Sequence, residues 1–357
     1  MTRVPSSAPE AAPVRAGEEL DIAAVDRWLK QQLPALSGSP RITQYAGGAS
    51  NWTYRLEYDN DDLILRRPPA GRKAKSAHDM RREYTIQKAI KPFFPLVAEM
   101  RAFCDDLSVI GSEFYVMERI DGIIPRHNLP SGVHLTEEET RRLCVSALET
   151  LVALHAIDYR AAGLEGVGAG SGYIRRQVEG WTRRYDEART WNVPRGTRIV
   201  AWMKGNIPSR ERLCVVHNDF RFDNLVLDRT DPTRVLGVLD WEMATIGDPL
   251  MDLGNSLAYW VEASDDFVAR SMRRQPTHLP GMLTRREVVD FYCERTGVDP
   301  GDWTFYEVYG LFRLSAIAQQ IYYRYHHKQT RNPAFRHFWF FVHYLHHRCM
   351  TAIRRRG

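Results

Sequence analysis

The sequence predicts an α+β fold of two lobes: a small N-terminal lobe with an antiparallel sheet and one main helix, and a larger, mostly helical C-terminal lobe. Residues 41–65 alternate between apolar and polar side chains, and residues 113–119 form a short apolar run typical of a buried strand. The second half of the chain is mostly helical in pattern. A length of 357 residues suits one two-lobed protein or two modest domains.

The N-terminal elements follow in a definite order. The alternation over residues 41–65 is interrupted at residues 47–51, where two glycines would let backbone amides approach an anion closely. An ordinary hairpin turn is the alternative for this segment. A strand over residues 62–69 ends at two prolines, and a helix is expected from about residue 75 to residue 91.

Two helix starts stand out in the second half. Thr136 is the expected N-cap of a helix, with Glu139 completing a capping box, and this helix should run to about His155. We expect His155 to be a packed helix residue, with a catalytic role as the alternative. Asp248 and Pro249 predict another start, as N-cap and first helical residue.

The strongest chemical signal is the order His217, Asp219, Asn224 and then Asp240, which has the form H-x-D-x-x-x-x-N followed by an acid. Phosphoryl transfer from ATP needs one carboxylate to orient a hydroxyl nucleophile. It also needs an amide and a second carboxylate to hold the magnesium that bridges the phosphates. Asp and Asn near strands are also common turn residues, which is the alternative interpretation.

The surroundings of this motif favour the chemical interpretation. Apolar runs at residues 225–227 and 235–239 predict two short buried strands, separated by turn-forming residues. A hairpin of these strands would return Asp240 to the side of Asn224. The motif therefore predicts Asp219 as the base and the other two side chains as magnesium ligands.

These residues resemble the aminoglycoside phosphotransferase and choline kinase superfamily, whose members are distant relatives of the protein kinases. In the protein-kinase pattern H-R-D-L-x-x-x-N, the Asp is the base and the Asn binds Mg²⁺. Asp240 matches the Asp of the D-F-G triplet, but Trp241 and Glu242 replace its Phe and Gly, so a flip of that triplet is not implied. The resemblance implies a protein-kinase-like fold, with ATP and Mg²⁺ as cofactors.

A narrower resemblance is to the phosphotransferase domain fused to acyl-CoA dehydrogenases in animals, which occurs as a free-standing protein in bacteria. It covers roughly residues 20–350 and is more specific for fold and ATP chemistry than for substrate. It is carried by the segments Gly48–Asn51, Leu65–Pro69, His78–Tyr84, Phe114–Glu118 and Leu239–Pro249.

The resemblance implies a set of ATP-binding residues: Gly47, Gly48, Ser50, Asn51, Arg66, Glu83, Met117, Glu118, Arg119 and Ile120. Arg66 stands where the wider superfamily has Lys, and the two are not equivalent in geometry. In the narrower group Arg is usual at this position. Glu83 is the expected partner of Arg66, with a solvated helix residue as the alternative. Arg67 should lie on the opposite face of the strand.

Two further residues have two interpretations each. Arg221 either neutralises charge on the transferred phosphoryl group or forms an ion pair with Asp223 or another acid. Asp252 either supports the catalytic loop by hydrogen bonds, with His217 as its partner, or compensates a helix dipole.

The resemblance also implies lobe boundaries. We expect a disordered tail over residues 1–18, a nucleotide-binding N-lobe over residues 19–118 and a C-lobe over residues 119–357. The hinge between the lobes should lie near residues 117–122, where backbone groups would bind the adenine edge.

Composition excludes several functions. A net charge of +5, scattered along the chain, does not indicate nucleic acid. The five cysteines lack CxxC spacing, so we expect no zinc site and a reducing, cytoplasmic location. The N-terminal residues lack the apolar region of a signal peptide, and no apolar stretch reaches membrane-spanning length. The oligomeric state stays open.

The acceptor is indicated only by charge. Residues 301–357 contain two acids, Asp302 and Glu307, with many aromatic residues among the cations. The cations in this segment are Arg313, Arg324, Lys328, Arg331, Arg336, Arg348, Arg354, Arg355 and Arg356. In this fold the C-terminal helices help to form the acceptor pocket, so a basic, aromatic segment favours an anionic acceptor with an apolar part, such as a hydroxyacyl-CoA. A solvated outer face is the alternative interpretation.

The expected partner is therefore a small molecule with a hydroxyl group. Alternatives are an aminoglycoside kinase, a nucleotide-binding pseudokinase and an adaptor. The acid-poor C-terminal segment counts against a polycationic aminoglycoside. The intact set of Asp219, Asn224 and Asp240 counts against a pseudokinase.

Overall fold

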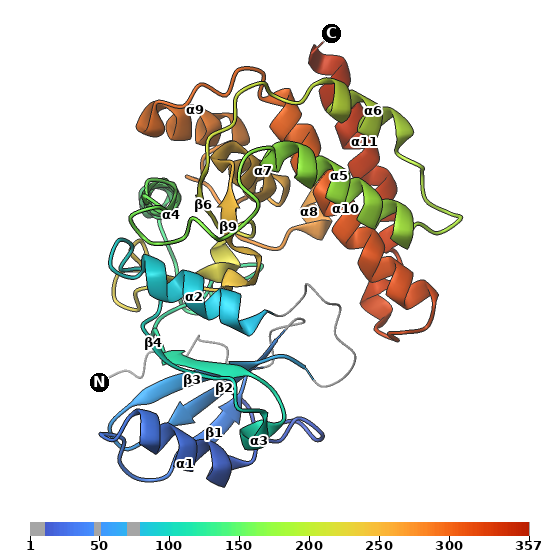
Figure 1. Ribbon diagram of the computed structural model, residues 1–357. Helices are drawn as coiled ribbons and strands as arrows, with labels where there is room; N and C mark the ends of the chain where they lie inside the picture. Colours follow the sequence, from blue (N-terminus) through green and yellow to red (C-terminus); the bar gives the residue numbers. More distant parts are fainter. Residues whose placement is uncertain (1–10, 46–50, 70–78, 357) are drawn as a thin grey trace. The chain divides into compact units, whose positions relative to one another are not determined.

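The computed structural model describes residues 11–45, 51–69 and 79–356, and these form two compact units. The first unit contains residues up to 135, with residues 161–164 and 222–244, and the second contains the remainder. Figure 1 shows a small antiparallel sheet in the first unit and mainly helices in the second, so the predicted α+β class is confirmed. Residues 222–244, expected in the C-lobe, pack with the N-terminal residues. The predicted lobe boundary itself stays a prediction.

The first unit is built on five antiparallel strands in the order β1-β2-β3-β5-β4. Their bounds are β1 Arg41–Gln44, β2 Trp52–Glu57, β3 Asp62–Arg67, β4 Met100–Cys104 and β5 Phe114–Glu118. The helices of this unit are α1 Ile22–Gln32, α2 Met80–Ile90 and α3 Leu107–Ile110.

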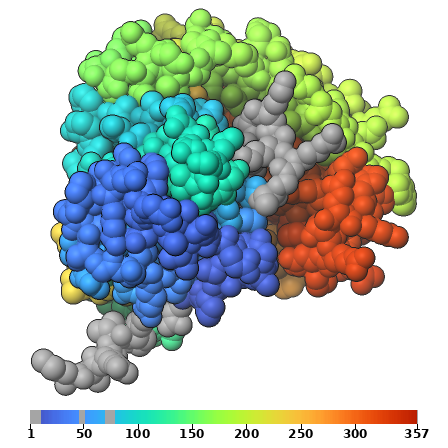
Figure 2. Space-filling view, turned by 60° about the horizontal axis from the view of Figure 1, so that its bottom comes forward, coloured from blue at the N-terminus to red at the C-terminus, as the bar shows by residue number. Residues whose placement is uncertain are grey.

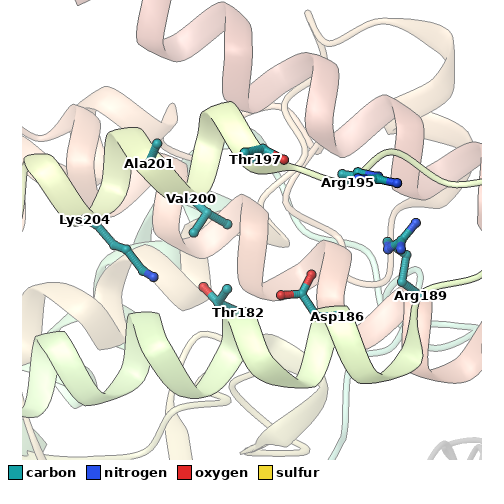
Figure 3. A pocket seen from close by; sticks show the side chains of 8 residues that line it. All are labelled: Thr182, Asp186, Arg189, Arg195, Thr197, Val200, Ala201 and Lys204. Atoms are coloured by element: carbon teal, nitrogen blue, oxygen red, sulfur yellow. The ribbon is translucent and has the colours of Figure 1, made fainter.

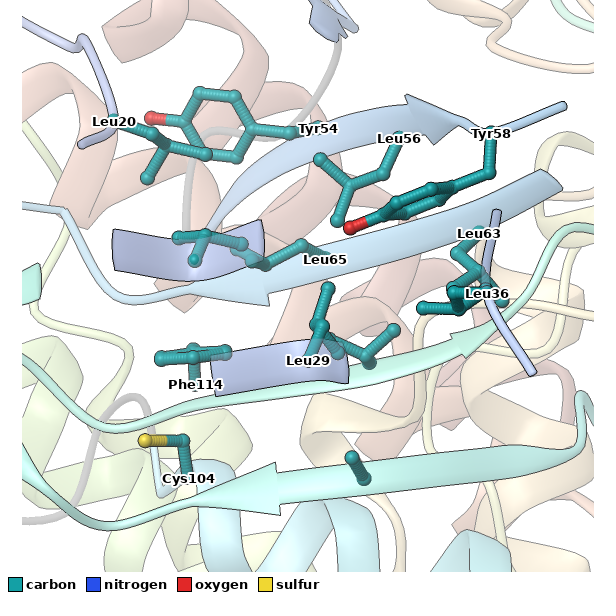
Figure 4. Close-up of a cluster of buried hydrophobic side chains, with 13 residues drawn as sticks. Leu20, Leu29, Leu36, Tyr54, Leu56, Tyr58, Leu63, Leu65, Cys104 and Phe114 are labelled. Atoms are coloured by element: carbon teal, nitrogen blue, oxygen red, sulfur yellow. The ribbon is translucent and has the colours of Figure 1, made fainter. Parts of the chain in front are cut away.

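Each face of the sheet is covered because side chains alternate along its strands. On β3, Leu63 and Leu65 join the cluster of α1, which includes Leu29 (Figure 4). Ile64 points the other way and packs with Met80 at the start of α2. Helices α1 and α3 lie side by side below the sheet in Figure 1, and Figure 2 shows their blue and teal surfaces in contact. Alternation therefore turns the neighbouring residues of β3 toward two different helices.

Residues 12–18, which the sequence placed in a disordered tail, pair with β1. Ala12 forms a bridge to Gln44, and the amide of Arg15 donates to the Gln44 side chain at 3.0 Å. The buried hydroxyl of Tyr54 donates to the carbonyl of Glu18 at 2.6 Å. This segment is ordered because it supplies partners to buried polar groups.

A short hairpin completes the first unit. It comprises η1 Phe222–Asn224, β7 Leu225–Leu227, β8 Val235–Val238 and η2 Trp241–Met243. Leu225 pairs with Val238, and the amide of Leu239 donates to the carbonyl of Asn224 at 2.7 Å. The expected hairpin is thus present, and it places Asn224 and Asp240 at the same end.

The second unit is mostly helical (Figure 1). Its helices are α4 Glu137–His155, α5 Tyr173–Ala188, α6 Thr197–Gly205, α7 Pro249–Ala258, α8 Phe267–Met272, α9 Arg285–Thr296, α10 Thr304–His326 and α11 Phe338–Arg356. A two-stranded ladder joins β6 Cys214–Val216 to β9 Thr245–Gly247. The capping box of Thr136 and Glu139 and the Asp248 N-cap are both formed, as predicted.

The five cysteines are free, and Cys293 is the least buried of them. Burial raises the pKa of the thiols, which therefore pack as small apolar side chains. Within the described ranges, no helix combines the length and apolar character needed to cross a membrane.

Helices α7 and α10 approach closely at a pair of glycines. A Cβ placed on Gly310 would lie 2.2 Å from the carbonyl oxygen of Gly254, and one on Gly254 would lie 2.7 Å from the carbonyl of Tyr306. Because both obstacles are backbone atoms, a methyl group cannot be accommodated by rotating a side chain. The close crossing therefore depends on glycine at these two positions.

Replacing Gly310 by Ala should lower the free energy of unfolding by about 1–3 kcal/mol, because the helices must separate. Urea denaturation of the purified variant would measure this. Gly205→Ala is the matched control, since a Cβ there meets nothing within 4 Å. We expect the control to be neutral or slightly stabilising. Equal stability of the two variants would contradict the packing argument.

Candidate active site

Arg66 on β3 joins two carboxylates of the first unit. Its Nη1 lies 2.7 Å from Oε1 of Glu83 on α2, and its Nη2 lies 3.0 Å from Oδ1 of Asp240. The ion pair with Glu83 was expected from the sequence, whereas the contact with Asp240 was not. Strand β3, helix α2 and the hairpin β7–β8 therefore meet at one guanidinium group.

Burial sets the electrostatics of this network. The Glu83 side chain is 2% exposed and that of Arg66 is 10% exposed. Burial alone would lower the pKa of Arg66, but the charges of Glu83, Tyr115 and Asp240 hold it well above its ordinary value. Burial raises the pKa of Glu83, although Arg66 and the Tyr115 hydroxyl, which donates to Glu83 at 2.6 Å, oppose this. A buried cation requires such partners.

Arg67 lies on the other face of β3, as strand alternation predicts. Its Nη2 donates to the carbonyl of Glu19 at 3.2 Å and to the Tyr54 hydroxyl at 3.3 Å. Its guanidinium also lies over the Trp52 ring, 4.7 Å from the centroid. Of the two arginines, Arg66 is therefore the one that contacts Glu83 and Asp240.

Asn224 and Asp240 have the chemistry of magnesium ligands. Both present oxygen atoms, which Mg²⁺ prefers. The Asp240 side chain is 39% exposed although Arg66 contacts it, and Asp240 has a left-handed backbone with φ of 65°. Among the described residues, no cluster of three or more His, Cys, Asp or Glu is arranged to hold a metal. One carboxylate and one amide nevertheless suit Mg²⁺, which takes its remaining ligands from phosphates and water.

The residues after Asp240 are anchored. Trp241 is buried, donates its Nε1 to the carbonyl of Val238 at 2.9 Å and packs edge-on against Phe94. The carbonyl of Glu242 accepts from Arg82 on α2 at 2.6 Å. The buried ring accounts for Trp in place of Phe, because it is part of the core, and the Glu242 side chain accepts from the Asn51 amide at 3.4 Å.

Of the predicted glycine-rich loop, Gly47, Gly48 and Ser50 lie outside the described residues. Asn51 is described and buried, at 2% exposure. Its side-chain amide lies 3.5 Å from Oε2 of Glu83. Asn51 thus contacts the carboxylate that pairs with Arg66.

The predicted hinge residues Met117 to Ile120 continue from β5. The amides of Glu118 and Arg119 donate to the carbonyls of Glu99 and Asp62, at 2.9 and 3.0 Å. The Arg119 side chain contacts Tyr45, Asp62 and Asp121, while Ile120 packs against the cluster that contains Met117. Among the described residues, none accepts from the Ile120 amide, which is therefore the available donor.

In the second unit, Asp252 organises the loop that carries Asp219. Its carboxylate, which is fully buried, accepts from the amides of His217 at 2.7 Å and Asn218 at 2.8 Å. The prediction that Asp252 supports this loop agrees with these contacts, but it is the His217 backbone that supplies the hydrogen bond. The His217 ring instead accepts from the amide of Asp219 at 3.2 Å.

His155 also contacts Asp252 and is a packed residue at the end of α4. Its Nε2 lies 3.2 Å from Asp252, and its Nδ1 lies 2.7 Å from the hydroxyl of Tyr292. Burial alone would raise the pKa of Asp252. The hydrogen bond to His155, the charges of His155 and His217, and the His217 amide together hold that pKa below 3.8, its ordinary value.

Asn218 is a supporting residue that the sequence analysis missed. It has a left-handed backbone with φ of 64°, and its side-chain oxygen accepts from Tyr173 and Asn255, both at 3.1 Å. Its carbonyl accepts from the buried Arg313 at 2.8 Å. An Asn between His and Asp was a usable signal, because Asn tolerates left-handed backbone better than most residues. Its partners on α5, α7 and α10 gave no local signal.

Arg221 pairs with Asp219 itself. The Nη2 of Arg221 lies 3.2 Å from Oδ2 of Asp219, and its Nε lies 3.2 Å from Oδ1. The guanidinium also lies 4.6 Å from the centre of the Tyr259 ring. An ion pair with an acid was one of the two interpretations of Arg221, and the acid is Asp219 rather than Asp223.

This chain is similar in sequence to known proteins. A family model described as "Phosphotransferase enzyme family" matches residues 41–288. Acyl-CoA dehydrogenase family member 11 of Mus musculus is 36% identical over 318 residues, which are 86% of this chain and 40% of the mouse protein. The chain thus spans about two fifths of that relative's length.

Solved structures agree on the fold. A Ralstonia eutropha protein, provisionally assigned as an aminoglycoside phosphotransferase, is 28% identical with a TM-score of 0.81, covering 94% of this chain and 99% of its own. Choline kinase of Cryptosporidium parvum is 13% identical with a TM-score of 0.65, covering 94% and 97%. The second similarity is one of fold alone.

Replacing Asp252 by Asn should lower the free energy of unfolding at pH 7 by roughly 1–3 kcal/mol, because a side-chain N–H would face a buried donor. A depressed carboxyl pKa contributes stability above the ordinary value, and that stability is lost as the pH falls through the folded-state pKa. The difference in the free energy of unfolding between wild type and variant should therefore decrease below pH 3.8.

Urea unfolding between pH 7 and pH 3 would measure this difference. Asp290→Asn, on α9, is the control, since this carboxylate is 65% exposed and should show almost no difference at any pH. A wild-type advantage that stayed constant down to pH 3 would contradict the depressed pKa.

Proposed function

Since this chain belongs to the phosphotransferase enzyme family, we propose that it is an ATP- and Mg²⁺-dependent kinase that transfers the γ-phosphate to a hydroxyl of a small molecule. The observation that carries the proposal is the pair of contacts by which the Arg66 guanidinium joins Glu83 to Asp240. A strand cation held by a helix carboxylate and aimed at the predicted metal ligand is what phosphoryl transfer requires.

The first unit binds the nucleotide in this proposal. Arg66 contacts the phosphates, and Glu83 and Tyr115 fix the direction of its guanidinium. The amide of Ile120 donates to the adenine edge, since the amides of Glu118 and Arg119 are already used within the sheet. The buried polar partners of Arg66 leave it few alternative rotamers, so little ordering remains to be done when ATP binds.

Asn224 and Asp240 would hold the metal. A Mg²⁺ ion bound by these two residues would supply positive charge to neutralise the phosphates. Arg66 already contacts Asp240, so the guanidinium and the carboxylate have fixed positions relative to each other before the nucleotide binds. The backbone hydrogen bond between Leu239 and Asn224 keeps the two ligand-bearing ends of the hairpin together.

Asp219 accepts a hydrogen bond from the acceptor hydroxyl and orients it for in-line attack. Arg221 holds this carboxylate in a single orientation. Asp252 holds the loop by two backbone amides, so Asp219 is carried on a rigid segment. Most of the rate gain then comes from positioning and from neutralised charge.

The acceptor in this proposal is an anion with an apolar part, such as a hydroxyacyl-CoA. The charge of residues 301–357 supports this, because few acids accompany many cations. Arg355 pairs with Glu307 and Arg356 with Asp302, so these two acids are already neutralised. A polycationic acceptor would find little negative charge there.

A panel of acceptors tests the proposal. Transfer of γ-phosphate from ATP with Mg²⁺ would be measured on hydroxyacyl-CoAs, choline, sugars and aminoglycosides. Transfer to a hydroxyacyl-CoA alone supports both the reaction and the acceptor. Transfer to aminoglycosides overturns the acceptor but leaves the reaction. ATP binding without transfer to any hydroxyl overturns the reaction in favour of a pseudokinase.

Asp219→Asn should lower kcat by about 10²- to 10⁴-fold, because the amide cannot accept the hydroxyl proton. Nucleotide affinity, measured by calorimetry, should stay close to that of wild type. Asp290→Asn, which removes an exposed carboxylate, is the control for the loss of one negative charge. Near wild-type turnover by the Asp219 variant would make the assignment of the base wrong.

Arg66→Lys should lower kcat/KM for ATP by about 10- to 150-fold, the equivalent of losing one charge-assisted contact of about 1.5–3 kcal/mol. A single ammonium cannot contact Glu83 and Asp240 with two separate nitrogens as the guanidinium does. Arg67→Lys makes the same change on the opposite face of β3 and should leave kcat/KM unchanged. Equal losses in both variants would contradict this assignment.

A further inference from the structure

A cavity of about 520 Å³ lies between α5 and α6 in the second unit (Figure 3). This volume is in the range of small-molecule sites. The cavity is lined by Thr182, Asp186, Arg189, Arg195, Thr197, Val200, Ala201 and Lys204. Figure 3 shows Asp186 and Lys204 pointing from the two helices into the space between them, with Arg189 and Arg195 at one end. None of these residues has a part in the proposed phosphoryl transfer.

The cations of this cavity are not neutralised by the protein. Arg189, Arg195 and Lys204 bring three positive charges, and Asp186 brings one negative charge. No described residue forms an ion pair or a side-chain hydrogen bond with any of these four side chains. Asp186 lies in the last turn of α5, and Arg189 is the C-cap of this helix with an extended backbone. Other exposed arginines of this unit do pair, as Arg295 does with Glu149 at 2.8 Å.

The start of α6 adds to the positive potential. Its N-cap is Gly196, with φ of 69° and no side-chain hydrogen bond to the helix. The first amides of a helix have no partner within it, and they form the positive end of the helix dipole. Thr197, the first helical residue, lines the cavity. The amides and the three cations therefore act on the same space.

A second cavity, of about 380 Å³, also reaches Thr197. It is lined by Arg198 and Arg354 and by His346, which is 6% exposed. The Nε2 of His346 has no hydrogen-bond partner among the described residues. A buried polar atom without a partner at the border of a cavity marks a place where a ligand can supply one.

We propose that the α5–α6 cavity binds a small phosphate-bearing anion with at least two negative charges. Arg189, Arg195 and Lys204 would contact the phosphate oxygens, and the amides at the start of α6 would donate to them. Asp186 would accept from a hydroxyl of the same molecule, which selects phosphate esters over bare anions. The cavity is formed by the second unit alone, whereas the proposed nucleotide residues Arg66, Glu83 and 117–120 belong to the first unit.

Calorimetry with inorganic pyrophosphate tests this directly. The full chain would be saturated with ADP and excess Mg²⁺, so that the proposed nucleotide site is filled, and then titrated. We expect one further binding event that weakens as salt is added. The double variant Arg189→Gln/Lys204→Gln should weaken this event at least tenfold, without a change in ADP affinity. Arg286→Gln, which removes an exposed cation from α9, should leave it unchanged.

A variant that should strengthen pyrophosphate binding provides the sharper test. Among the described residues, Asp186 is the one acid that lines the cavity, so Asp186→Asn should tighten pyrophosphate binding several-fold. Because all these side chains are exposed, the variants should keep the wild-type melting temperature. The proposal is overturned if ADP abolishes pyrophosphate binding, or if the double variant and Asp186→Asn both bind as wild type does.

The transfer assay distinguishes two sources of the phosphate, namely the acceptor itself and a separate effector. This part of the test rests on the proposed function. A raised KM for the acceptor in the double variant would identify the ligand as a phosphate carried by the acceptor itself. An unchanged KM would identify it as a separate effector. Because pyrophosphate binding is measured without turnover, a failed transfer assay leaves the binding result intact.

Discussion

The structure of the first unit depends on neutralising one buried positive charge. Arg66 is nearly excluded from solvent, so its guanidinium must be surrounded by acceptors. Glu83 and Asp240 meet this demand from a helix and from a distant hairpin. The sheet, α2 and residues 222–244 are therefore tied together by the same group that is proposed to hold the phosphates. In the proposed function, stability and nucleotide binding would be coupled, because the same carboxylates would serve both.

The second unit, in contrast, contains a buried negative charge. Asp252 is fully buried, and it accepts from two backbone amides and from His155. These donors lie on α4 and on the loop after β6, so one carboxylate fixes the loop that carries Asp219. Asn218 completes the arrangement by accepting from α5, α7 and α10. These contacts hold the loop from several directions, and the Asp219 carboxylate itself pairs with Arg221.

The unpaired cations between α5 and α6 are informative because the buried charges described above are paired. Both buried networks pair their charges closely, whereas the cavity between α5 and α6 keeps three cations without partners among the described residues. Exposed cations tolerate this because water screens them. The three cations line the same cavity as the start of α6, which has no side-chain cap. This combination distinguishes the cavity from a solvated surface. The protein completes the charge balance in both buried networks, whereas a ligand is proposed to complete it in the cavity.

The sequence alone determined the α+β class, the hairpin after the H-x-D-x-x-x-x-N motif, the Arg66–Glu83 pair and the helix starts at Thr136 and Asp248. The fold class, the hairpin and the helix starts follow from alternation, helix caps and spacing, which are local along the chain, whereas the Arg66–Glu83 pair was implied by the resemblance to a known family. Only the tertiary structure decided that Arg66 also contacts Asp240, that residues 12–18 pair with β1, and that Arg313 and Tyr173 hold Asn218. Such contacts join residues tens to more than a hundred positions apart. No local pattern encodes them, because they arise when buried polar groups find partners as the elements pack.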